Sequence, residues 1–122
     1  MLRFGSSIVV AACLLAAGAA AAAPASTPSL RVRPTVAARG TTVRFAGSVG
    51  TGCARGNAVT LISKLFPNHA FGGAGAIYAT VRAGGLFSRR YVVPRRTPRG
   101  RYRISARCGG GNLGVTARLR MT

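Results

Sequence analysis

Arginine is the residue type that this sequence supplies in quantity for chemistry. The 122 residues include 18 Lys or Arg and no Asp or Glu, which gives a formal net charge of +18. A guanidinium group binds phosphate or carboxylate through a planar fork of N–H donors. Two groups of residues are the predicted contacts to an anionic polymer: Arg101, Arg103, Arg107, Arg118 and Arg120 near the end of the chain, and Arg95, Arg96 and Arg99 just before them.

A second interpretation of this charge is compositional. Arg far outnumbers Lys, and Ala and Gly are abundant, as GC-rich coding produces. Such coding explains Arg in place of Lys but does not explain the absence of acidic residues, so both interpretations stay open. The partners that fit a functional basic surface are anionic polymers, such as teichoic polymers, acidic polysaccharides or free DNA, anionic lipid headgroups, or the acidic surface of a protein.

The missing carboxylates also exclude several kinds of site. A carboxylate acid/base pair, a Ser-His-Asp triad and a side-chain Ca²⁺ cage all need Asp or Glu. His69 has no carboxylate to orient it and is interpreted as a loop residue, and Lys64 has no motif around it. The glycine-rich stretches 71–75 and 109–111 do not match a phosphate-binding loop. We therefore predict no enzyme, no cofactor and no metal site, and no sequence-specific binding of nucleic acid.

The N-terminal segment has the three parts of a secretory signal peptide. A short basic start precedes an apolar run, and small residues precede Pro24. We expect a cleaved signal peptide at 1–23 and a short linker at 24–28, which makes the mature protein secreted and free of a transmembrane span. In the alternative, Cys13 is lipidated and anchors a lipoprotein.

Export determines how the remaining cysteines are interpreted. Once the signal peptide is removed, Cys53 and Cys108 form an even pair in an oxidising compartment. A disulfide between them is the expectation, and two free thiols are the alternative.

The elements that must position the arginines are short β-strands. Residues 29–122 consist of alternating apolar and polar stretches separated by Gly and Pro, which is typical of an all-β antiparallel sandwich or barrel. About seven strands are expected, near 30–33, 42–49, 59–65, 77–81, 86–93, 101–108 and 115–121. In the last two, Tyr102, Ile104, Ala117 and Leu119 alternate with the arginines, so the arginines share the outward face.

The order of several short motifs resembles the secreted immunoglobulin-like β-sandwich modules of bacteria. These are the 30–34 strand ending in Pro, the turn and strand at 40–43, Gly85-Leu86-Phe87-Ser88 leading to Pro94, and Gly100-x-Tyr102 leading to Cys108. The resemblance implies an Ig-like domain over 29–122, with both cysteines at the same rim.

Several features qualify that resemblance. There is no Trp beside the cysteines. Tyr102 is either a tyrosine corner or an ordinary core residue. Arg89 is in phase with inward Phe87 and Tyr91, so a bulge or a sheet edge is expected there. The family also includes small-ligand carriers, which this basic chain with one bridge fits poorly. The leading function is a non-enzymatic module of the envelope or extracellular space that binds anionic polymers, and the alternative is an adhesive module with an acidic protein partner.

Overall fold

The regular secondary structure of the described residues consists of β-strands and one short 3-10 turn. The computed structural model describes Gly5 and residues 27–122, so Cys13, most of the predicted signal peptide 1–23 and most of the linker 24–28 lie outside it. The strands are β1 (Ser29–Arg33), β2 (Val36–Ala37), β3 (Thr42–Ser48), β4 (Ala58–Ile62), β5 (Ala76–Thr80), β6 (Leu86–Val92), β7 (Gly100–Cys108) and β8 (Gly111–Met121), with one 3-10 turn, η1 (Ala83–Gly85). The predicted all-β class is confirmed.

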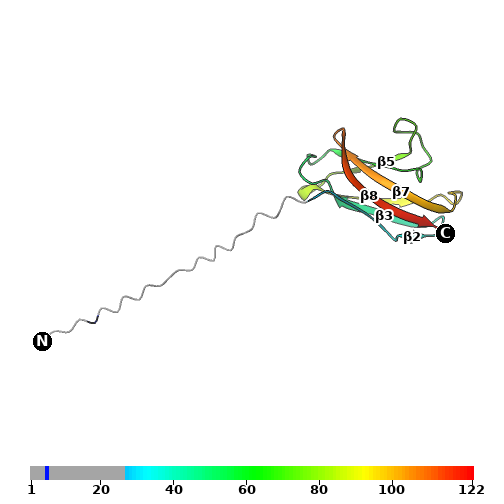
Figure 1. The fold of residues 1–122 in the computed structure, drawn as a ribbon, viewed down its shortest axis with the longest axis horizontal. Helices are drawn as coiled ribbons and strands as arrows, with labels where there is room; N and C mark the ends of the chain where they lie inside the picture. The colour runs from blue at the N-terminus through cyan, green and yellow to red at the C-terminus, as the bar shows by residue number, and fades with distance from the viewer. Residues whose placement is uncertain (1–4, 6–26) are drawn as a thin grey trace.

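The strands form two sheets, one with the order β1-β3-β6 and one with the order β2-β8-β7-β4-β5. Neighbouring strands are antiparallel except β2 and β8, which run parallel. Figure 1 shows the strands running along the long axis of the module, with β8 ending beside the C-terminus. Strand β1 begins at one end of the module. We call the opposite end, where β8 ends and β7 begins, the distal end.

Alternation along the strands builds the core between the sheets. The largest fully buried side chains include Phe45, Leu61, Ile104 and Leu119, and the alternation of the last two strands predicted the inward positions of Ile104 and Leu119. The ring of Phe66, which follows β4, packs edge-on against Phe45 at 5.8 Å and against Tyr91 at 5.0 Å between ring centroids. Phe66 lies just beyond the expected strand near 59–65, in a bend where the strand period does not apply.

Two details of the strands differ from expectation. Val36 and Ala37 form β2 where a turn was expected, and they pair with Arg120 and Met121. Two residues are too few to show alternation, and their pairing is possible only once β8 is in place. Strand β8 begins at Gly111, four residues before the expected start near 115, because the hairpin from β7 is tight.

Cys53 and Cys108 form the predicted disulfide, with their Cα atoms 6.0 Å apart. Cys53 lies in the loop after β3, and Cys108 ends β7. Strands β3 and β7 both finish at the end of the module opposite the distal end, so the bridge lies at the rim and not in the middle of the core. A disulfide of this kind is typical of an oxidising environment.

Arg89 lies at a sheet edge, which is one of its two expected placements. Strand β6 is an edge strand and pairs with β3 without a register shift, so there is no bulge between them. The exposed Arg89 side chain donates from Nη1 to the Tyr78 carbonyl at 3.2 Å. Tyr78 is on β5, the edge strand of the other sheet, so this arginine joins the two sheets at one open side of the sandwich.

Candidate polyanion-binding face

The β7–β8 hairpin carries two arginine pairs that face each other across the strands. Arg101 is opposite Arg120 and Arg103 is opposite Arg118, and all four side chains are exposed. Side chains directly opposite on antiparallel strands have their Cβ atoms about 4.5–5.5 Å apart. We call this set of four residues the arginine face.

The register of the hairpin is fixed by the buried residues between the arginines. Ile104 and Ala117 are directly opposite each other and face the core. A slip of one residue would move the arginines into the core, which fixes them on the outer side. The four arginines, with Thr35, Tyr102 and Leu119, line a shallow hollow of about 360 Å³.

The arginine face carries positive charge that no acidic side chain compensates. The sequence has no side-chain carboxylate that could pair with a guanidinium group. Two like charges 6 Å apart in water repel each other by roughly 0.7 kcal/mol before screening. The Debye length at physiological salt is about 8 Å, which exceeds the Cβ separation of each directly opposite pair, so salt screens the repulsion only in part and a bound anion would relieve it.

Arg107 lies apart from the other arginines of β7. The β7–β8 register shifts between Ser105 and Arg107, so Arg107 is opposite Asn112. Its guanidinium group donates to the Gly110 carbonyl at 3.2 Å and lies 5.4 Å from the centre of the Phe71 ring. The structure thus gives Arg107 local partners, whereas Arg101, Arg103, Arg118 and Arg120 stay together.

The loop from β6 to β7 brings Arg95, Arg96 and Arg99 to the distal end. All three are exposed, and the stem of Arg95 lies over Gly40. The Tyr102 hydroxyl donates to the Pro98 carbonyl at 2.6 Å and so ties the loop to the beginning of strand β7. A bond from a tyrosine hydroxyl to a backbone carbonyl a few residues upstream also occurs in the tyrosine corner of sandwich folds. Strand β7 leaves this loop at Gly100, so the loop arginines adjoin Arg101.

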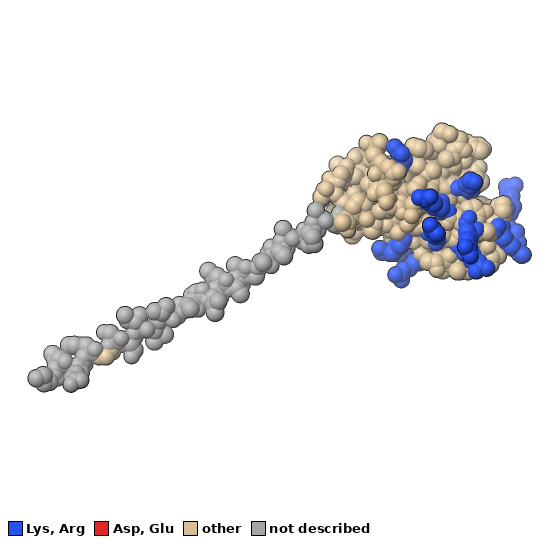
Figure 2. Space-filling model, viewed as in Figure 1, with Lys and Arg blue, Asp and Glu red and all other residues tan. Residues whose placement is uncertain are grey.

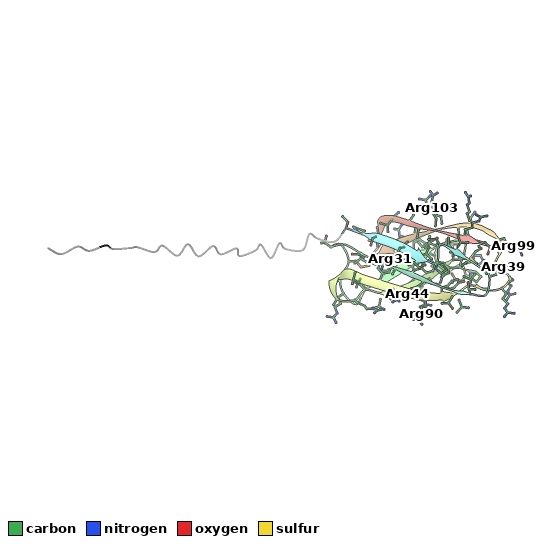
Figure 3. All side chains as sticks on the ribbon, turned by 90° about the horizontal axis from the view of Figure 1, so that it is seen from below. Arg31, Arg39, Arg44, Arg90, Arg99 and Arg103 are labelled. Atoms are coloured by element: carbon green, nitrogen blue, oxygen red, sulfur yellow. A yellow bond between two sulfur atoms is a disulfide. The ribbon has the colours of Figure 1, made fainter. Side chains whose placement is uncertain are left out.

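Basic side chains gather toward the distal end. In the view of Figure 2 most of the Lys and Arg side chains lie toward the right of the module and a few lie on its left half, with no Asp or Glu in view. Figure 3 shows Arg103 on one side of the sandwich and Arg44 and Arg90 on the opposite side.

The three-stranded sheet contributes arginines that the sequence analysis did not place among the contacts. Arg33, Arg44 and Arg90 form a row across β1, β3 and β6. The alternation of each strand already marks Arg31, Arg33 and Arg44 as outward. The row itself depends on cross-strand register, which no single strand contains.

The other residues considered for chemistry form no site. His69 is exposed, and its Nδ1 lies 3.0 Å from the Gly73 carbonyl within the loop between β4 and β5. Lys64 is exposed as well. Within residues 27–122, no three His or Cys side chains gather as a metal site would require. In the same range no helix is long and apolar enough to cross a membrane.

Comparisons with known proteins support the fold alone. No family model and no curated protein matches the sequence. Three solved structures are similar in fold: Yersinia pseudotuberculosis InvD (22% identity, TM-score 0.58, 80% of this chain and 28% of that chain), Pseudomonas fluorescens alkylpurine DNA glycosylase AlkC bound to DNA containing an abasic site analogue (20%, 0.53, 76% and 29%), and a tetra-tandem repeat from the extending region of a large adhesion protein (23%, 0.53, 78% and 24%). The chain spans less than a third of each of them.

Proposed function

We propose that this protein is a secreted, non-enzymatic binding module that holds anionic polymers in the envelope or extracellular space through its arginine face. The observation that carries the proposal is the pairing of Arg101 with Arg120 and of Arg103 with Arg118 on one exposed surface. Four guanidinium groups lie there, and the sequence has no side-chain carboxylate to neutralise them. Anions are therefore the natural counterions of this surface.

Phosphate-bearing polymers fit this surface best. Arginine forms paired hydrogen bonds to phosphate oxygens, and the loop residues Arg95, Arg96 and Arg99 extend the surface at the distal end. The contacts would be to the backbone of the polymer, because no α-helix is present in residues 27–122 to enter a nucleic acid groove.

The proposed location and family also have support. The disulfide favours an oxidising compartment, and the N-terminal sequence is typical of an exported protein. The first two strands belong to different sheets, because β1 pairs with β3 and β2 pairs with β8. With the tyrosine-corner bond of Tyr102, this layout supports an immunoglobulin-like module.

A second candidate function is adhesion to an acidic protein. The likeness in fold to a repeat of a large adhesion protein favours it. The same arginines would then contact carboxylates of the partner protein.

A triple variant tests the arginine face. Replacing Arg101, Arg103 and Arg118 with Gln should weaken binding to inorganic polyphosphate. Each neutralised phosphate contributes about −0.7 to −0.9 to the slope of log K against log salt, so losing up to three contacts should flatten the slope by roughly 2. Affinity measured across a salt gradient provides both quantities.

The matched control removes three positive charges elsewhere. Arg55, Lys64 and Arg89 are exposed and lie outside the arginine face and the loop between β6 and β7, and their triple Gln variant should keep most of the parent's affinity and slope. Equal binding by the parent and the arginine-face variant at every salt concentration would refute the proposal. If the parent does not bind polyphosphate but binds an acidic protein through these arginines, the adhesive function replaces the proposed binding of anionic polymers.

A further inference from the structure

We propose a second anion-binding site on the outer face of the three-stranded sheet, which takes a segment of a phosphate-bearing polymer. Strands β1, β3 and β6, together with Arg82 and Ala83, line an open hollow of about 770 Å³ there. It is separate from the arginine face, because the two lie on different sheets of the sandwich. We call it the β3 hollow.

The floor of the β3 hollow is low because the central strand carries small residues. Ala46 is half-buried and Ser48 is buried, although both face outward from the sheet. The neighbours of Ala46 across the strands are Arg31 on β1 and Ser88 on β6. On the β1 side the long Arg31 side chain therefore rises above a sunken centre.

Four arginines surround this floor. Arg33 and Arg44 are directly opposite each other at the end of the hollow nearer the distal end, and Arg31 is on the β1 side. On the β6 side, Arg82 donates from Nη2 to the Ser88 hydroxyl at 2.8 Å, which holds its guanidinium group at the rim. Charges thus line both sides and one end.

The serine hydroxyls of the hollow are also available as donors. Ser29 Oγ accepts the Ser48 N–H at 3.1 Å, and Ser48 Oγ accepts the Gly50 N–H at 3.2 Å. Ser88 Oγ accepts from Arg82. A hydroxyl whose oxygen already accepts keeps its own proton to donate. Guanidinium groups can only donate hydrogen bonds, so the polar side chains of the hollow all offer donors. They therefore suit a ligand that is rich in acceptor oxygens, such as a phosphate chain.

The position of the β3 hollow has a consequence for the whole module. Figure 3 shows Arg44 and Arg103 on opposite sides of the sandwich. Sheets in a sandwich are about 10 Å apart, and both sets of arginines point away from the core. One module can therefore hold two polymer chains at once and link them. This linking rests on the proposed function of the arginine face, whereas the β3 hollow stands on its own contacts.

Site-resolved NMR with tripolyphosphate tests the β3 hollow. The short anion should shift the backbone amide signals of Ala46, Gly47 and Ser48 as well as those of β7 and β8. In the variant Arg31→Gln, Arg44→Gln, Arg82→Gln, affinity read from the β3 signals should fall at least tenfold, and the β7–β8 shifts should remain. The spectrum itself shows whether the variant is folded.

The triple variant of Arg101, Arg103 and Arg118 is the matched control, since it removes the same charge from the other sheet. It should keep the β3 shifts and lose those of β7 and β8. If β3 signals do not move in the parent, or move equally in the Arg31, Arg44 and Arg82 variant, the β3 hollow is no site. Movement at β3 without movement at β7–β8 would instead reject the proposed function alone.

Two further measurements address linking and the source of the phosphate. Long-chain polyphosphate mixed with the parent should scatter light through linked chains, and each triple variant should lose most of that signal. A parent that binds polyphosphate at both sites without scattering light would overturn the linking.

Phosphatidylglycerol vesicles test the source of the phosphate. They should leave the Ala46 amide signal in place, and a shift with vesicles but not with polyphosphate would overturn the assignment to a polymer.

Discussion

At the scale of single residues, two tyrosines tie loops to the sandwich through their hydroxyl groups. Tyr102 bonds to the Pro98 carbonyl at 2.6 Å, and Tyr91 lies 3.5 Å from the Leu65 carbonyl while its ring packs on Phe66. Tyr102 therefore holds the arginine-bearing loop at the distal end, and Tyr91 holds the turn after β4.

Removing the Tyr102 hydroxyl should cost stability without changing the fold. We expect Tyr102→Phe to lower the free energy of unfolding by about 0.5–1.5 kcal/mol, which is typical of one hydrogen bond. Urea titration measures it. Tyr78→Phe is the control, because Tyr78 is exposed, and it should change little. Equal effects of the two substitutions would mean that the corner bond contributes nothing.

Alkaline pH should act on the fold through Tyr91. Burial raises the pKa of the Tyr91 hydroxyl above its usual value. Folding thus favours the neutral hydroxyl of Tyr91. The resulting contribution to the free energy of unfolding is complete below the unfolded pKa, about 10. It is lost as the pH rises from there through the higher pKa of the folded state. Tyr91→Phe should lose less stability than the parent between pH 9 and about pH 12. Parallel pH curves for the two proteins would contradict this.

At the scale of elements, the close approach of β1 to β3 depends on Gly47. A Cβ atom at this position would overlap the Ser29 carbonyl and lie 3.0 Å from the Phe87 ring. The outward residues of β1 and β3 line the β3 hollow, so this approach also sets its shape.

Gly47→Ala should therefore destabilise the sandwich. Overpacking of a filled interior costs about 1–3 kcal/mol, and here backbone as well as side-chain atoms must shift. Gly52→Ala is the matched control, since a Cβ there meets no atom within 4 Å. Thermal unfolding of both variants measures the difference. Equal midpoints would show that β1 moves aside freely.

At the scale of the whole molecule, the absence of acidic residues changes how the protein responds to pH. In most proteins, acid unfolds the chain by protonating carboxylates that are paired in the native state. This sequence has no Asp or Glu. Acid therefore finds no side-chain carboxylate to protonate in the folded protein, and this cause of acid unfolding is missing.

We expect the free energy of unfolding to change by less than about 1 kcal/mol between pH 7 and pH 2.5 at constant ionic strength. Urea titration at several pH values checks this for the oxidised protein. Added salt should instead raise stability, because it screens the repulsion among the arginines. Acid unfolding similar to that of carboxylate-rich proteins would contradict the prediction.

The sequence by itself determined the all-β class, the inward positions of most strands and the Cys53–Cys108 bridge. Alternation specifies which side of a strand is buried, and so it also marked Arg101, Arg103, Arg118 and Arg120 as outward. These are local properties, or follow from the cysteine count.

Only the tertiary structure decided which arginines meet. Pairing register places Arg101 opposite Arg120 and forms the row of Arg33, Arg44 and Arg90, while a register shift separates Arg107 from the rest. The two-residue strand β2 exists only because β8 offers it a partner. The β3 hollow likewise needs three strands and the Arg82 segment together. Contacts between residues distant in sequence are set by packing of the whole chain, so no local pattern could show them.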